Sequence, residues 1–180
     1  MKHDFDPRHL NIDTFAQVQG SLQDSLPLAR FDRLLEEAQG VAPDTAVHFS
    51  AQGMLRPGAG GTEQVWLTLS AHIDLPQTCQ RCLGPVAVPV SFEREFRFVA
   101  SEEVAEVEDE ASEEDVLVTA RDFNLLELVE DELLMALPVV PKHDVCPAPV
   151  KLQVADPDFV DAEPEKPNPF AVLEQLKRKP

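Results

Sequence analysis

The residues best suited to chemistry are two cysteines, Cys79 and Cys82, with two residues between them. Thiolates at this spacing can bind one Zn²⁺ in tetrahedral geometry, but two ligands do not complete a structural zinc site. A third cysteine, Cys146, follows His143 at the same spacing. These four residues form a candidate Cys₃His zinc site if the fold brings the two distant pairs together. The alternative is two cysteines in a turn and an unrelated Cys146.

A thiol-redox role is the other chemistry open to Cys79 and Cys82. Redox-active pairs of this type lie at a helix N-terminus, where the thiol pKa is lowered. Here Gly84, Pro85 and a strand pattern follow the pair instead. The sequence also contains no Gly-rich phosphate loop, no Gly-x-Ser-x-Gly motif and no His-Glu-x-x-His motif. We therefore expect a protein that is not an enzyme.

The cysteine pair is expected in a turn between two strands of an antiparallel sheet. Apolar residues alternate with polar ones over 47–51, again over 65–73, and on one face of a third run over 86–99. A Gly-rich break over 57–61 separates the first two runs, which is typical of a hairpin with one buried face. Residues 76–85 then link the second strand to the third.

Helical patterns flank this sheet. Apolar residues recur at three- and four-residue spacing from Leu28 to Ala38, and again after Asn124, a good N-cap, as far as Pro138. Weaker patterns suggest short strands over 12–22 and 116–119. The predicted fold is α+β: an antiparallel β-meander, open or barrel-like, covered by two helices.

One basic residue interrupts the apolar face of the third strand. Arg94 has the same parity as the apolar residues around it, so an unbroken strand would direct it into the core. Either a β-bulge shifts the register or Arg94 pairs with a buried acid. We expect the bulge.

The charge of the chain is strongly negative and uneven. The net charge is −18, and residues 102–115 hold nine acidic residues and no basic one. Blocks of like charge are usually solvated loops, which predicts an acidic loop here. A negative field repels a phosphate backbone, whereas basic proteins are natural partners for it.

The predicted domain spans residues 1–141, and residues 142–180 form an extended tail that ends in a short helix. Asn168 and Pro169 mark the start of this helix. Its apolar and cationic residues, together with Arg81 beside the cysteines, are candidate partner contacts: Arg81, Phe170, Leu173, Lys177, Arg178 and Lys179.

Cellular location is expected to be cytoplasmic. No apolar run approaches the roughly 20 residues needed to cross a bilayer, and the N-terminus lacks the pattern of a secretory signal. Three cysteines also do not make the disulfide framework of a small secreted protein.

Three segments together resemble the YceD family of large ribosomal RNA subunit accumulation proteins. They are Cys79 to Leu83, the stretch from Leu128 to Asp144, and the end from Lys166 to Lys179, which contains Lys-Pro-Asn-Pro-Phe-Ala-Val-Leu. Some relatives carry further cysteines after the segment that contains Leu137 and Pro138. At that place this chain offers only His143 and Cys146.

The resemblance implies a cytosolic factor in the synthesis, processing or stability of 23S ribosomal RNA. Combined with the acidic charge, it suggests action through a basic ribosomal or assembly protein that binds the acidic loop and the C-terminal helix. The first alternative is a zinc-stabilised module that contacts ribosomal RNA directly through Arg81, Arg97 and the terminal cations. The second alternative is a thiol-redox protein.

Overall fold

The computed structural model describes residues 5–147, except 41–43, 59–60, 111 and 113. The elements in chain order are α1 (Ile12–Gln17), β1 (Ser21–Pro27), a 3₁₀ turn η1 (Leu28–Arg30), α2 (Asp32–Glu36), β2 (Ala46–Pro57), β3 (Glu63–Thr78), β4 (Pro85–Val99), α3 (Glu102–Asp109), β5 (Asp115–Val118) and α4 (Leu125–Met135).

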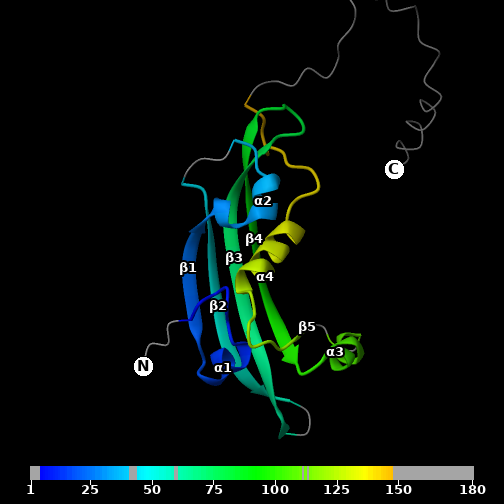
Figure 1. Cartoon of the computed structure of the whole chain (residues 1–180). Helices are drawn as coiled ribbons and strands as arrows, with labels where there is room; N and C mark the ends of the chain where they lie inside the picture. Colours follow the sequence, from blue (N-terminus) through cyan, green and yellow to red (C-terminus); the bar gives the residue numbers. More distant parts are fainter. Residues whose placement is uncertain (1–4, 41–43, 59–60, 111, 113, 148–180) are drawn as a thin grey trace, which may run out of the picture. The chain divides into compact units, whose positions relative to one another are not determined.

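The five strands form one sheet in the order β1-β2-β3-β4-β5 (Figure 1). Strands β1 to β4 are antiparallel to their neighbours, and the short β5 is parallel to β4. Strands β1 and β5 form the two edges, so the sheet is open and not a barrel. The predicted α+β class and the antiparallel meander are confirmed.

Period-two patterning explains why the long central strands share one buried face. In register, Ala71 of β3 lies between Phe49 of β2 and Phe92 of β4. The same parity buries a row on each strand, interrupted on β4 at Phe92 and Arg94, and these rows form most of the core: Val47, Phe49 and Ala51; Leu67, Leu69, Ala71, Ile73 and Leu75; Val88, Val90, Phe96 and Phe98.

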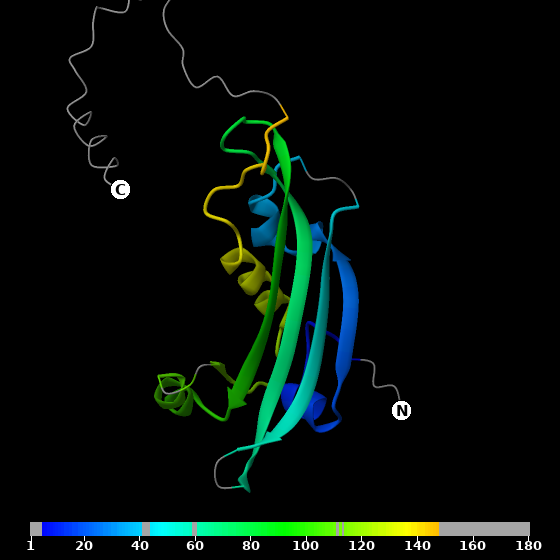
Figure 2. The same ribbon diagram turned by 180° about the vertical axis from the view of Figure 1, so that it is seen from behind.

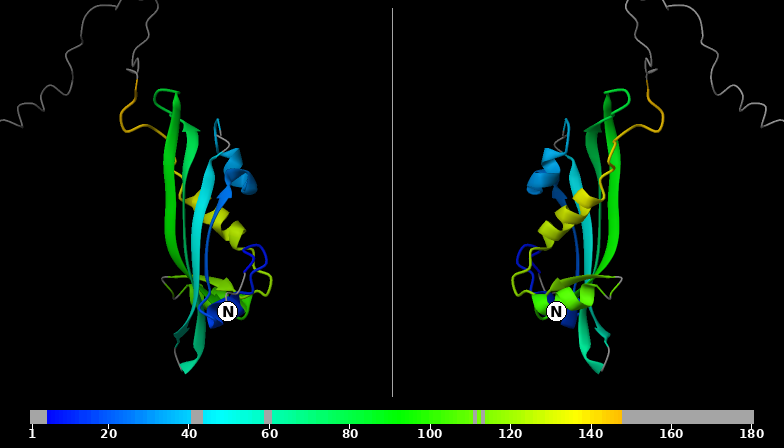
Figure 3. Two further views of the ribbon diagram at one scale, coloured as in Figure 1. Left: turned by 90° about the vertical axis from the view of Figure 1, so that its left-hand side faces the viewer. Right: turned by 90° about the vertical axis from the view of Figure 1, so that its right-hand side faces the viewer.

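Helices of the described residues cover this apolar face, whereas the opposite face is covered only at Arg97, near the end of β4, by the segment of α3 and β5. Helix α4 lies across β3 and β4, while α2 packs beside α4 (Figures 1 and 3). Seen from behind, the long strands carry no helical layer from the described residues over their outer face (Figure 2). None of the described helices is both long enough and apolar enough to span a membrane.

The prediction for the helix after Asn124 is confirmed. The side chain of Asn124 accepts a hydrogen bond from the N–H of Leu126 at the start of α4. Leu125, Val129 and Leu133 are fully buried against the sheet. The helix ends before Pro138, which cannot continue the backbone hydrogen bonding.

Of two local predictions near the N-terminus, the first is wrong and the second is confirmed only in part. Residues 12–17 form helix α1 and not part of a strand, because Asn11 caps the helix through the N–H of Thr14 and the helix buries Ile12 and Phe15. The helix expected from Leu28 to Ala38 is instead the 3₁₀ turn η1 followed by the short α2.

The predicted β-bulge at Arg94 is also wrong. Arg94 pairs with Leu69 in an unbroken register, and its side chain meets acids on the helical side of the sheet. Its Nε lies 3.1 Å from Oε2 of the buried Glu132, and its Nη1 donates to Asp115 at 3.0 Å. Pairing with a buried acid, the alternative left open by the sequence, is what the structure shows.

The acidic loop predicted over 102–115 is wrong for most of that segment. Residues 102–109 form helix α3, and β5 begins at Asp115. The physical reason is Arg97, which is buried and pairs with Glu108 and, at 2.8 Å, with Glu114. Neutralising part of the charge in this way lets the segment fold against the end of β4.

Residues 142–147, predicted to open an extended tail, lie against the turn between β3 and β4. The remainder of the predicted tail and its C-terminal helix lie outside the described residues.

Candidate metal centre

The first arm of the candidate site is the turn that joins β3 to β4. The N–H of Cys79 donates to the carbonyl of Gly84, and the carbonyl of Cys79 accepts from the N–H of Leu83. Leu83 has a φ of 58°, a left-handed conformation that non-glycine residues adopt mainly in turns. This turn places the thiols of Cys79 and Cys82 on the same side.

The second arm is the segment that follows α4. It returns to the turn, where the N–H of Gln80 donates to the carbonyl of Pro141 at 2.8 Å. Two residues further on, the N–H of His143 donates to Cys79 Sγ at 3.4 Å. These backbone contacts hold His143 and Cys146 beside the cysteine pair, although the two arms are far apart in the sequence.

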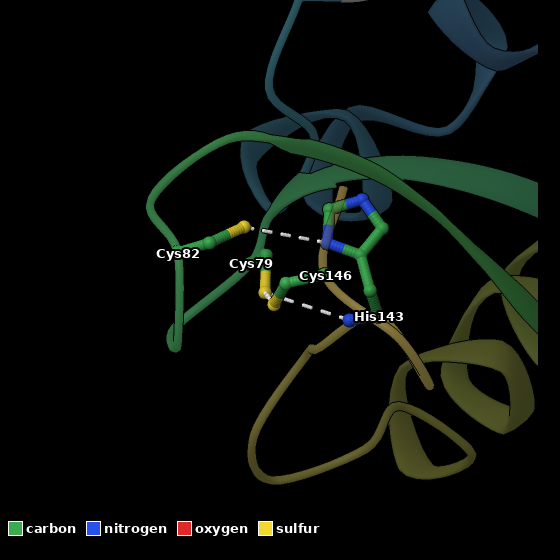
Figure 4. Close-up of side chains that lie close together, drawn as sticks. All are labelled: Cys79, Cys82, His143 and Cys146. Atoms are coloured by element: carbon green, nitrogen blue, oxygen red, sulfur yellow. Dashed lines mark hydrogen bonds between the residues drawn. The ribbon is translucent and has the colours of Figure 1, made fainter. Parts of the chain in front are cut away.

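The four predicted ligands converge in the structure. One ligand atom from each of Cys79, Cys82, His143 and Cys146 can be chosen so that all four lie within 4.8 Å of one another. Cys79 Sγ is 3.9 Å from Cys146 Sγ, and Cys82 Sγ is 3.5 Å from His143 Nδ1 (Figure 4). Tetrahedral Zn²⁺ with bonds of about 2.0–2.3 Å has ligands separated by distances of this order.

Arg81 completes the surroundings of the thiols. Its Nε donates to Cys146 Sγ at 3.1 Å, and its Nη2 donates to the carbonyls of His143 and Asp144 at 2.8 and 3.1 Å. The guanidinium thus joins the two arms and brings a positive charge to the sulfur atoms. This hydrogen bond to Cys146 raises the pKa of Arg81.

The thiols differ in their readiness to ionise. Burial raises the pKa of Cys79, but N–H donors from Cys82, His143 and Arg81 together outweigh it and lower the pKa to about 5. For Cys82, the N–H of Gly84 lowers the pKa, whereas burial and the neighbouring Cys79 and Cys146 raise it, and the net pKa is raised. The cluster therefore favours a first thiolate at Cys79, which is the form that binds metals.

The donor set can hold a thiophilic divalent ion. Three sulfurs and one imidazole nitrogen match the composition of structural zinc sites, in which the protein supplies all four ligands. A catalytic zinc site needs an open coordination position for water or substrate, and a set of four protein ligands leaves none. Cys79 is buried and the other three ligands are half-buried, so the site lies at the edge of the fold.

Only some of the remaining predicted contact residues lie among the residues that the structure describes. Arg81 lies in the candidate metal centre, with its guanidinium engaged as described above. Arg97, proposed as an RNA contact, is buried by its acidic partners, so that assignment is wrong. The C-terminal set lies outside the described residues: Phe170, Leu173, Lys177, Arg178 and Lys179.

Sequence reasoning missed how Arg81 and the backbone build the site. The bond between Gln80 and Pro141 and the contacts of Arg81 with the second arm depend on tertiary approach. No periodicity or motif encodes such an approach. The only available signal was the position of Arg81 between the two cysteines.

Comparison with known proteins finds the family that the three sequence segments resemble. The family model described as "Large ribosomal RNA subunit accumulation protein YceD" matches residues 67–177. A protein of that name from Haemophilus influenzae is 36% identical over 109 residues, which cover 60% of this chain and 63% of that relative. No solved structure gives a significant match.

Proposed function

The chain belongs to the YceD family, and on that basis we propose that it is a non-enzymatic factor in the synthesis, processing or stability of 23S ribosomal RNA. The observation that carries this proposal is the family match, which includes both arms of the candidate metal centre. Its place of action is the cytoplasm, where the large ribosomal subunit is assembled.

A non-enzymatic role is supported by the character of the Cys₃His cluster. Four protein ligands make a site that stabilises structure, because no coordination position is left for a reacting group. A bound Zn²⁺ would join the β3–β4 turn to the segment after α4. The cysteines also lie in a turn between strands and not at a helix N-terminus, which gives little support to the thiol-redox alternative.

Action through a basic ribosomal or assembly protein is supported by the distribution of charge. The net charge is −18, and four arginines of the folded body are engaged in ion pairs with its own acids: Arg33, Arg56, Arg94 and Arg97. Only Arg8, Arg30, Arg121 and Lys142 have cationic side chains with no partner among the described residues. A phosphate backbone needs many such cations, whereas a basic protein is attracted by the net charge.

Helix α3 is the densest acidic surface in the described part of the chain. Glu102, Glu103, Glu106 and Glu110 are exposed, and Val107 beside them is 73% exposed. Because Glu108 and Glu114 hold the segment to Arg97, the exposed acids are displayed on an ordered element. We therefore assign α3 to the partner-binding surface.

A second candidate function is a zinc-stabilised module that contacts ribosomal RNA directly. The convergence of Cys79, Cys82, His143 and Cys146 favours such a module. The two functions differ in their dependence on salt, since direct phosphate contacts make affinity fall steeply as salt rises. Binding of the purified chain to 23S ribosomal RNA at increasing salt separates them: the leading proposal predicts weak binding at every concentration.

The route through a basic protein is tested by charge neutralisation. Glu102, Glu103, Glu106 and Glu110 are changed together to Gln, and the variant is used to recover large-subunit proteins from a host extract. The matched control neutralises four exposed acids elsewhere: Asp24, Asp74, Glu93 and Glu127. We expect the α3 variant to lose a ribosomal partner that the control retains. Equal recovery by both variants would refute the role of α3.

A further inference from the structure

A groove of about 670 Å³ lies beside the candidate metal centre. Its lining comes from the end of β3 and the following turn, from residues 137–141 after α4, and from Glu37 and Gln39 after α2. We propose that this groove binds a peptide segment of a basic protein that contributes an apolar side chain and an N–H donor. The inference rests on the proposed function and names the site through which a protein partner is held.

The candidate metal centre fixes one wall of the groove. Gln80 and Pro141 both line it, and the hydrogen bond between them joins β3 to the segment after α4. One residue before Gln80 is the ligand Cys79, and two residues after Pro141 is the ligand His143. A metal that joins these ligands therefore holds the two sides of the groove in place, as a preformed binding site requires.

The wall after α4 presents apolar side chains directly to solvent. Val139 is 100% exposed and Val140 is 54% exposed, although both lie in a segment anchored at Pro141. Large apolar side chains held in solvent on a fixed segment are typical of a surface that another protein covers. Leu137 and Pro138 continue this apolar lining.

A buried polar group in the lining also lacks a partner. Gln77 is only 8% exposed, and its Nε2 donates to the carbonyl of Glu37 at 3.3 Å. Its Oε1 accepts no hydrogen bond from any described residue. Leaving a buried acceptor unpaired costs free energy, so an N–H group brought by a bound segment would stabilise the complex.

The charge of the groove indicates a protein occupant and not RNA. Glu37 is the only charged residue in the lining, and it is exposed with no ion partner among the described residues. A carboxylate beside apolar side chains repels a phosphate backbone and attracts a lysine or arginine side chain. The occupant that fits is thus a peptide that carries an apolar residue next to a basic one.

The test uses the full-length chain loaded with Zn²⁺ and overlapping synthetic peptides that cover the large-subunit ribosomal proteins of the host. We expect at least one peptide with adjacent apolar and basic residues to bind. Val139→Asp should weaken that binding by roughly tenfold or more, as truncation of a central contact does. Because Val139 is fully exposed, this change should leave the fold and the Zn²⁺ content unaltered.

The matched control is Val145→Asp, which alters an exposed valine of the same arm that does not line the groove. It should bind the peptide as the wild type does. Gln77→Met gives a second readout: peptide affinity should fall while thermal stability is retained. A fall in stability with unchanged affinity would show that Gln77 has only a structural role.

Several results overturn the inference. They are equal binding by the wild type and Val139→Asp, no binding by any peptide, or binding of a 23S ribosomal RNA fragment that depends on Val139. The proposed function is tested separately in a deletion strain. If deletion lowers 23S ribosomal RNA and the Val139→Asp chain restores it fully, the groove inference fails and the proposed function stands. If deletion changes nothing, the proposed function fails.

Discussion

At the scale of single residues, Arg81 is the side chain whose role depends most on the fold. It donates to Cys146 Sγ and to two carbonyls of the second arm, which places its positive charge beside the sulfur atoms. Three thiolates and one Zn²⁺ carry a net charge of about −1, which a neighbouring guanidinium offsets. Groups around a metal site commonly set its affinity even though they do not touch the ion.

We therefore predict that Arg81→Ala weakens Zn²⁺ binding by roughly tenfold or more, the usual effect of losing an outer-shell partner. Competition with a chromophoric chelator measures the affinity. Arg121→Ala is the control, because Arg121 is exposed and has no partner among the described residues. Equal Zn²⁺ affinities for the two variants would show that Arg81 does not support the site.

Glu132 is a second residue whose environment has a measurable consequence. It is 5% exposed, and burial raises its pKa, with Arg94 opposing and Asp115 and Asp131 reinforcing the shift. Although Arg94 Nε is 3.1 Å from Glu132 Oε2, this oxygen has no hydrogen-bond partner among the described residues. The ion pair thus compensates burial of the carboxylate only in part.

A raised pKa fixes the sign of the pH dependence. The folded state holds the proton of Glu132 more tightly than the unfolded state, so its contribution to stability falls as pH rises from about 4.5 through the raised value. We predict that Glu132→Gln increases the free energy of unfolding at neutral pH, because Arg94 keeps Asp115 as a partner.

Urea unfolding of the Glu132→Gln variant and the wild type at about pH 7 and about pH 4 checks this prediction. The advantage of the variant should shrink at the lower pH, where the wild-type side chain is protonated. A variant that is less stable at neutral pH would show that the pair with Arg94 outweighs the cost of burial.

At the scale of elements, the sequence predicted those that bury a regular apolar face, and it did not predict those that depend on contacts between distant residues. The hairpin of β2 and β3, strand β4 and helix α4 follow from apolar periodicity, because each buries one regular face against the core. Helix α3 could not be predicted in the same way, since it depends on Arg97, which the linear pattern placed among exposed polar residues. The candidate ligands were predictable by type and spacing, but their convergence required the two arms to meet.

Helix α1 shows the same limit, and it also explains a glycine inside β2. A Cβ at Gly53 would lie 2.6 Å from Phe15 Cδ1 and 3.0 Å from the Cα of Ala16, both in α1. We predict that Gly53→Ala destabilises the protein by about 1–3 kcal/mol, the usual cost of overpacking a core. Chemical denaturation measures the change.

The control for Gly53→Ala is Gln52→Ala, since Gln52 precedes it in β2 and is exposed on the other face of the sheet. That change should alter stability by less than about 0.5 kcal/mol. Similar losses for both variants would mean that the strand, and not its contact with α1, is sensitive at this point.

At the scale of the whole molecule, charge determines the character of the surface, and the Cys₃His cluster can join two distant parts of the chain. Half of the arginines among the described residues bind the chain's own acids, which leaves an acidic surface with few free cations in this part of the chain. The four ligands can be joined by a metal at the end of the sheet, next to the groove with exposed valines. Both features support the proposal that the partner is a basic protein.

The proposed role in 23S ribosomal RNA accumulation is tested in a deletion strain. The gene is deleted in its host, and the ratio of mature 23S to 16S ribosomal RNA is measured with and without the wild-type chain supplied from a plasmid. We predict that the ratio falls on deletion, through a selective loss of 23S ribosomal RNA, and recovers when the chain is supplied. An unchanged ratio with a normal profile of large subunits would show that the chain has no such role.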